Sequence, residues 1–258
     1  MIGSTNTDNG TTRKPVSGRL LDLLMALGAG MITWGFIHTQ DPFFKVEKKY
    51  HISGLGEPDE KWSAYLVQQS RVDFKNAALV LGVLGGTLGA VLAIGGMSRV
   101  SLGKRLFIGI VLGGLVGMVA GVAGCWLQQS FARTGSVSVV QSALVNALLF
   151  GILGLGLGGI VRVFSGFGRA VVDHAIFGLI VGIFAGIAYP TIAYVSMASV
   201  NIEALIPQAM AARLLWLGIV TSLFGLLLPG SVEKQLGLQA AEPAELHSGS
   251  AIRSLLSK

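Results

Sequence analysis

Two long apolar segments that carry many glycines and almost no charge constrain this chain more than any other feature. They are residues 78–97 and 106–124, and the short turn between them carries Arg99, Lys104 and Arg105. Each segment is close to the roughly 20 residues that an α-helix needs to cross a bilayer. Charged residues make up only 12% of the chain, against about 25% in an average soluble domain. The pattern predicts an integral membrane protein.

The glycines of the second segment recur at every fourth position: Gly109, Gly113, Gly117 and Gly121. This spacing places them on one face of a helix, where the missing side chains let another helix approach closely. Related glycines occur in the neighbouring apolar segments. The full set that we expect at helix–helix contacts is Gly82, Gly86, Gly109, Gly113, Gly117, Gly121, Gly151, Gly178, Gly182 and Gly186.

Apolar runs of spanning length recur along the chain and predict an all-α protein with six transmembrane helices in residues 19–230. Residues 1–18 and 231–258 are polar and are predicted to be tails, with Pro229–Gly230 ending the last helix. The expected spans are Leu20–Ile37, Asn76–Met97, Arg105–Leu127, Val140–Val161, Val171–Tyr194 and Ala212–Leu228.

The first apolar run could instead be a cleaved signal peptide. We favour a retained span, because the run is longer than a typical apolar signal region and no small-x-small cleavage site precedes the polar residues at 38–42.

Residues 39–75 form one long polar connection, expected outside the membrane on the extracytoplasmic side. Its second half begins at Pro58 and places Trp62, Tyr65 and Leu66 near one face. This pattern predicts either an amphipathic helix lying at the membrane interface and leading into the second span, or an ordinary loop helix that caps the bundle.

Basic residues are concentrated in the second-to-third and fourth-to-fifth loops, which carry five of them: Arg99, Lys104, Arg105, Arg162 and Arg169. The positive-inside rule therefore predicts that both termini are cytoplasmic. The six Lys or Arg residues of the 39–75 connection oppose this orientation. The short loops favour a cell membrane, and specifically a bacterial inner membrane.

Two hairpins of the chain align with one another. Residues 78–92 match 143–157 without gaps, and Gly109, Gly113 and Gly117 then match Gly178, Gly182 and Gly186. Both hairpins would run in the same direction, so we expect either a parallel repeat about an axis along the membrane normal or a coincidence of biased composition.

Catalytic and metal-binding motifs are missing from the sequence, including the P-loop, G-x-S-x-G, H-E-x-x-H and C-x-x-C. Asp173 and His174 begin the fifth span and could form an acid–base pair, although a carboxylate at a helix N-terminus is the simpler interpretation. His38 and Asp41 are too few for a metal site. We therefore expect no enzyme activity, no cofactor and no metal.

The net charge of +6 does not predict nucleic-acid binding, because the basic residues lie in loops beside apolar spans. The single cysteine, Cys125, is expected to be a buried apolar side chain rather than a reactive thiol.

Polar residues inside the predicted spans are rare. The fifth span contains a proline that should kink it, and the fourth contains an amide. The residues that could line a cavity are Asn146, Tyr189, Pro190, Thr191 and Tyr194. Two functions remain open: a structural or accessory subunit that associates with itself or with another membrane protein, and a passive channel or permease that uses this cavity.

Overall fold

The computed structural model of the chain describes residues 16–40, 42–51, 59–95, 101–133, 138–165, 170–197 and 204–240. These residues form six α-helices and one 3-10 turn, and they contain no strand. The predicted tails at 1–18 and 231–258 lie largely outside them. The elements are α1 (Val16–Gln40), η1 (Lys48–Tyr50), α2 (Asp59–Gly95), α3 (Leu102–Ala132), α4 (Val139–Ser165), α5 (Ala170–Ser196) and α6 (Met210–Ala240).

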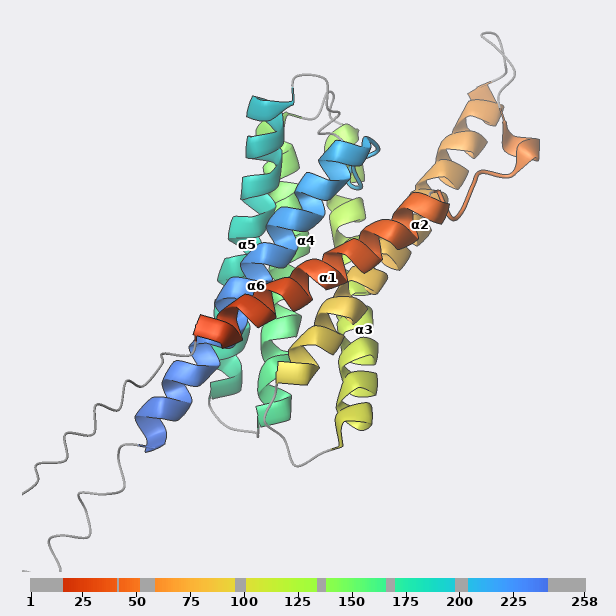
Figure 1. The fold of residues 1–258 in the computed structure, drawn as a ribbon. Helices are drawn as coiled ribbons and strands as arrows, with labels where there is room; N and C mark the ends of the chain where they lie inside the picture. Colours follow the sequence, from red (N-terminus) through yellow and green to blue (C-terminus); the bar gives the residue numbers. More distant parts are fainter. Residues whose placement is uncertain are drawn as a thin grey trace, which may run out of the picture.

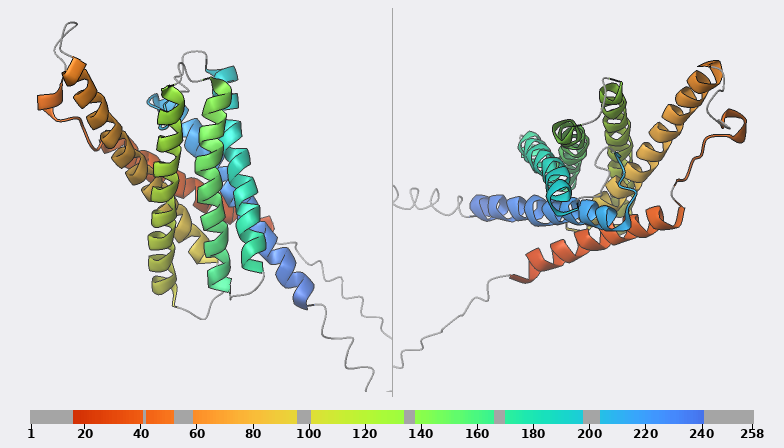
Figure 2. Two further views of the ribbon diagram at one scale, coloured as in Figure 1. Left: turned by 180° about the vertical axis from the view of Figure 1, so that it is seen from behind. Right: turned by 90° about the horizontal axis from the view of Figure 1, so that it is seen from above.

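Four of these helices, α2 to α5, are long and apolar enough to cross a membrane. The fold is therefore that of an all-helical protein compatible with a membrane location. Consecutive helices form two antiparallel pairs, α2 with α3 and α4 with α5, and these make the most extensive interfaces in the structure. Figure 1 and Figure 2 show α3, α4 and α5 running side by side, while α1 and α6 cross them obliquely.

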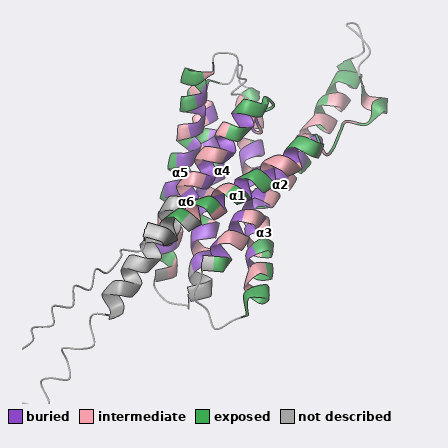
Figure 3. Ribbon diagram, in the orientation of Figure 1, coloured by how far each residue is buried: buried purple, intermediate pink, exposed green. Residues whose placement is uncertain are grey.

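The inner helices are α2 and α4. In their most apolar stretches 61% of the residues are buried, against 28% for α3 and 33% for α5. Figure 3 accordingly shows exposed residues along the outer side of α3. Large apolar side chains on α2 and α4 fill the centre, including Leu84, Leu88, Leu149 and Leu153. Trp216 of α6 closes the core against Phe150 of α4, with ring centroids 5.5 Å apart.

One continuous helix, α2, contains both the helix predicted after Pro58 and the second span that it was expected to lead into. Neither glycine nor proline interrupts the chain between Asp59 and Leu81, so α2 continues without a break. At 1.5 Å per residue, its 37 residues extend roughly 55 Å. A bilayer core measures about 30 Å, so a helix of this length fits within it only when tilted, and Figure 1 shows α2 running obliquely to α3, α4 and α5.

The sixth helix also continues past its predicted end. Pro229 and Gly230 lie inside α6, which runs to Ala240. A proline removes only one helical hydrogen bond and can kink a helix without ending it. The same holds for Pro190, which lies inside α5.

Main-chain contact through glycine joins each helix pair. A Cβ atom built on Gly113 of α3 would overlap the carbonyl oxygen of Gly85 on α2, and one built on Gly109 would overlap that of Gly89. In the second pair, Gly178 of α5 meets the carbonyl oxygen of Gly154. Further contacts of this kind join Gly117 to Leu81, Gly121 to Ala77, Gly182 to Phe150, Gly186 to Asn146 and Gly158 to His174.

The structure places the expected glycines differently on the two sides of each pair. Those of α3 and α5 meet main-chain atoms of the partner helix. On α2, however, Gly85 and Gly89 make the close approach. A Cβ atom at Gly82 would first meet the Met118 side chain, and one at Gly86 would lie 3.3 Å from the Ile110 carbonyl oxygen. On α4, Gly151 likewise faces the side chains of Leu179 and Ile183.

Adjacent glycines on α4 provide a test of this packing. A Cβ atom at Gly158 would overlap the carbonyl oxygen of His174, whereas one at Gly159 would meet nothing within 4 Å. Gly158→Ala should destabilise the protein by about 1–3 kcal/mol, because the methyl group forces α4 and α5 apart. Gly159→Ala should leave stability unchanged or raise it by about 0.5–1 kcal/mol through helix propensity. Thermal unfolding in detergent measures both, and equal melting temperatures would contradict the contact.

Candidate functional site

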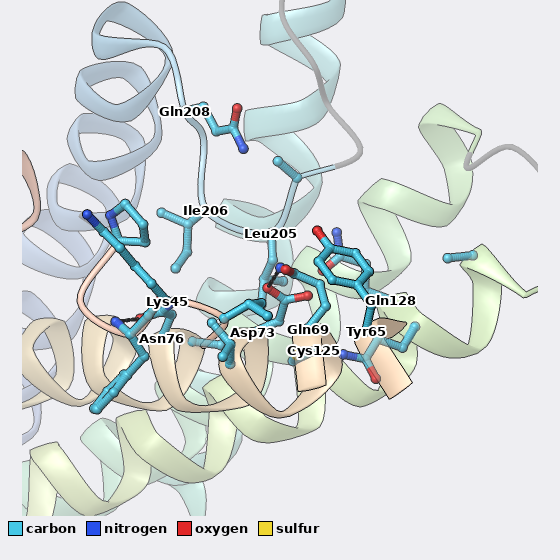
Figure 4. Close-up of a pocket in the computed structure, with 18 of the residues that line it drawn as sticks. Lys45, Tyr65, Gln69, Asp73, Asn76, Cys125, Gln128, Leu205, Ile206 and Gln208 are labelled. Atoms are coloured by element: carbon cyan, nitrogen blue, oxygen red, sulfur yellow. Dashed lines mark hydrogen bonds between the residues drawn. The ribbon is translucent and has the colours of Figure 1, made fainter. Parts of the chain in front are cut away.

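A cavity of about 1010 Å³ opens at the end of the bundle where α2 begins and α3 ends. Four segments that are distant in sequence enclose it: residues 42–51, the first half of α2, the end of α3 and residues 204–208. In Figure 4 the two helices lie below the cavity, and the segment with Leu205, Ile206 and Gln208 lies above it.

Asn76 attaches the segment 42–51 to α2. Its Oδ1 atom accepts a hydrogen bond from the Phe44 N–H at 2.9 Å, and its Nδ2 donates to the Phe44 carbonyl oxygen at 3.1 Å. The Asn76 side chain is only 8% exposed, so these bonds are shielded from water. The Lys75 ammonium lies 5.7 Å from the centroid of the Phe44 ring on the same segment. Together these contacts fix one wall of the cavity.

Gln129 connects α3 to α2 in the floor of the cavity, which these two helices form. Its Oε1 atom accepts a hydrogen bond from the Ser70 hydroxyl at 2.7 Å. Its Nε2 approaches the Ser70 carbonyl oxygen and the Cys125 sulfur, each at 3.5 Å. Cys125 is buried with a free thiol, as expected of an apolar side chain.

The segment above the cavity is held by α6. The buried Arg213 donates from Nε to the carbonyl oxygen of Pro207 at 2.7 Å. Leu205, two residues before Pro207, is 8% exposed and belongs to the apolar core. A charged donor and an apolar anchor thus position this segment over α2 and α3.

Asp73 lies at the centre of the cavity, next to Gln69 (Figure 4). Its Oδ1 atom accepts a hydrogen bond from Gln69 Nε2 at 2.8 Å. Asp73 precedes the apolar segment that begins at Asn76, so it lies on the polar part of α2. Burial raises the pKa of the Asp73 carboxyl, and the bond from Gln69 offsets this only in part. The carboxylate has no ion-pair partner among the described residues.

The mouth of the cavity carries charge of both signs. Lys45 and Lys48 are exposed there. Glu47, between them, forms an ion pair with Lys49, with Nζ and Oε2 2.7 Å apart. Within the described residues, the rim therefore carries two ammonium groups without an ion pair, those of Lys45 and Lys48. The carboxylate beside them, Glu47, is already neutralised by Lys49.

The five residues expected to line an intramembrane cavity are not brought together at one. Asn146, Tyr189 and Pro190 are buried between helices, whereas Thr191 is exposed and Tyr194 is 63% exposed on the outside of α5. The Asn146 amide bonds within its own helix. It donates from Nδ2 to the Ser142 carbonyl oxygen of its own helix at 2.9 Å.

The other candidate groups of the sequence are also separated. Asp173 is exposed, whereas the neighbouring His174 is buried at 3% exposure. His38 stacks on Trp34 with ring centroids 4.9 Å apart, and Asp41 lies outside the described residues. Across the described ranges, no three His, Cys, Asp or Glu side chains gather as a metal site would need.

The sequence patterns did not predict this cavity as a whole, although the spacing of its polar residues on α2 can be recognised in the sequence. Gln69, Asp73 and Asn76 follow one another at spacings of four and three, so they share one face of a helix. A polar stripe immediately before an apolar span indicates a polar surface at the membrane boundary. The partners from residues 42–51, 125–132 and 204–208 come from separate parts of the chain, and no local pattern connects them.

The two hydrogen bonds between Asn76 and Phe44, which we call the Asn76 clamp, can be tested by mutation. Asn76→Leu removes both bonds to Phe44 and leaves the Phe44 N–H and carbonyl groups without these partners. This should destabilise the protein by about 1–3 kcal/mol. Limited proteolysis should then cut within residues 42–51 faster than in the wild type. Asn76→Asp keeps the acceptor and loses the donor, so it should fall between the two. Equal cleavage rates for all three proteins would contradict the clamp.

No protein-family model matches the chain, and no curated protein or solved structure shows significant similarity to it. Its function therefore has to be argued from this geometry alone.

Proposed function

We propose that this chain is a multi-pass membrane protein of structural or accessory type, which binds a second copy of itself or another membrane protein. Its contact surface, which we call the platform, is the first part of α2. In this proposal all six helices lie in the bilayer and the helix pairs join through glycine zippers. Both termini face the cytoplasm, and the cavity faces the extracytoplasmic side of a cell membrane, which we take to be a bacterial inner membrane.

The single observation that carries the proposal is the projecting first part of α2. This part carries exposed apolar side chains, with Trp62 at 41%, Leu66 at 59% and Val67 at 54% exposure. Lipid would cover such side chains within the bilayer, but this part of α2 also carries polar and charged residues such as Gln68, Arg71 and Lys75, which favour a position outside the hydrocarbon core. Exposed apolar groups outside the hydrocarbon core favour contact with another protein.

The positions of the hairpin contacts support the idea that the two helix pairs arose by duplication. The sequence alignment equates Gly89 with Gly154 and Gly109 with Gly178. Gly89 meets Gly109 in the first pair, and Gly154 meets Gly178 in the second. The next contacts correspond as well: Gly85 with Gly113 and Phe150 with Gly182, then Leu81 with Gly117 and Asn146 with Gly186. Chance similarity of composition does not require a shared contact register.

A passive channel or permease is the second candidate function. It is favoured by three buried polar atoms without a hydrogen-bond partner: Asn146 Oδ1, Tyr189 Oη and Trp216 Nε1. Such atoms are expected to have a partner, which a bound water or small solute would supply. Against this function, the main-chain contact between α4 and α5 at Asn146 and Gly186 leaves no space between those helices at this level.

Photo-crosslinking tests the platform. A photoreactive amino acid at Leu66 should crosslink to protein, because this position lies on the projecting part of α2. The matched control is Val119, which is 61% exposed on α3 and should crosslink to lipid. Absence of protein crosslinks at Leu66, together with a monomer in native mass spectrometry, would refute an interaction role for this surface.

Liposome flux tests the second candidate. The platform proposal expects reconstituted protein to release small solutes no faster than empty liposomes. Flux that Asn146→Leu abolishes, with Thr191→Val as the exposed control on α5, would instead establish the channel.

A further inference from the structure

We infer that the cavity at the outer end of the bundle binds the ammonium group of a zwitterionic ammonium–phosphate ligand, with Asp73 as its counter-ion. The chemistry is that of the phosphoethanolamine group. It occurs both free in solution and as the head group of phosphatidylethanolamine. The inference deepens the proposed function by assigning a ligand to its outer platform, and the lipid source depends on the proposed membrane placement.

The Asp73 carboxylate lacks a cation. Asp73 is partly buried, and a carboxylate in such a place is stabilised in its charged form by an opposite charge or by several hydrogen bonds. Asp73 has one hydrogen bond, from Gln69 at 2.8 Å, and no ion pair within the described part of the chain. The undescribed stretches that adjoin the cavity-lining segments in sequence contain no Lys, Arg or His; they are residue 41 and residues 52–58, 134–137 and 198–203.

The surroundings of Asp73 suit an ammonium group. A primary ammonium has three N–H donors and no acceptor, so it needs several oxygens. Gln69 uses its Nε2 on Asp73, which leaves its carbonyl oxygen beside the carboxylate as a further acceptor. Gln128 and the Tyr65 hydroxyl lie on the same side of the cavity (Figure 4). A quaternary ammonium has no N–H donor, so it would fit this lining less well.

The rim supplies the complementary charge. Lys45 and Lys48 are exposed at the mouth, and Lys49 neutralises Glu47 between them. Ammonium groups bind phosphate oxygens through charge-assisted hydrogen bonds. A ligand with its ammonium at Asp73 and its phosphate at the rim would satisfy both ends of the cavity. The cavity volume of about 1010 Å³ is ample for such a group.

The position of the cavity allows access from a bilayer surface. Asn76, where the apolar segment of α2 begins, lies in its wall, and so does Cys125, close to where the apolar segment of α3 ends. The cavity thus lies at the level where lipid head groups meet the helices. Apolar side chains of Val72, Ala77 and Leu205 in its lining can accommodate the carbon atoms of the ligand.

Native mass spectrometry and calorimetry of the purified full-length chain in detergent test the inference. The probes are phosphatidylethanolamine, phosphatidylcholine, phosphatidylglycerol and soluble glycerophosphoethanolamine. We expect phosphatidylethanolamine to bind more tightly than the other two lipids. Asp73→Asn, which keeps the shape of the side chain, should weaken this binding about ten-fold through loss of the charge-assisted bond. Glu60→Gln is the matched control, because that carboxylate is exposed on α2 and does not line the cavity, and it should change the affinity less than two-fold.

A second variant protects the test from a folding defect at Asp73. Lys45→Gln combined with Lys48→Gln changes only exposed side chains, and it should weaken phosphatidylethanolamine about three-fold at low salt with an unchanged melting temperature. Equal binding of the three lipids, or equal affinity of the wild type and Asp73→Asn, would overturn the inference.

The soluble probe separates the two sources of the ligand. Affinity of glycerophosphoethanolamine equal to that of the lipid would identify a free ligand, and selective binding of the lipid would identify a head group from the leaflet; either result upholds ammonium recognition. Failure of the inference is distinguishable from failure of the platform, because crosslinking at Leu66 does not depend on Asp73.

Discussion

Main-chain contact between paired helices is the interaction on which the rest of this structure depends. Inside a bilayer, apolar side chains gain little by leaving lipid, so helices associate through close van der Waals contact and hydrogen bonds. Gly113 against Gly85 and Gly178 against Gly154 bring the helices together at the main chain. A single methyl group at any of these positions would replace attraction with overlap. The two pairs therefore have little freedom to slide or separate.

This rigidity determines what can form at the ends of the helices. With α2 and α3 packed against each other, the Ser70 hydroxyl and Gln129 come within hydrogen-bond distance, and the two helices form the floor of the cavity. The other walls are attached to that floor by individual polar contacts, from Asn76 to Phe44 and from Arg213 to Pro207. The apolar interior thus provides the scaffold, and a small number of hydrogen bonds shape the site.

The sequence predicts the helical class well, because apolar runs and four-residue glycine spacing are local signals. It predicts the contact glycines of α3, which has one main row of them. It does not distinguish between the two rows of α2, where Gly82 and Gly86 lie beside Gly85 and Gly89; only the position of the partner selects the second row. Nor could it assemble the cavity, whose four segments meet only after the helices have paired.

Asn146, which is buried, and Asp73, which is partly buried, show how far local structure can explain polarity in such a protein. Asn146 is 2% exposed, but its amide N–H is satisfied by the carbonyl oxygen of Ser142 in the same helix. Main-chain acceptors of this kind cannot compensate a carboxylate, which needs donors or a cation. Asp73 has a single donor from its own helix, so most of its charge is left for something outside the described chain. Because Asp73 is only partly buried and lines an open cavity, water can solvate its free side, and a bound ammonium group would replace that water with a direct ion pair.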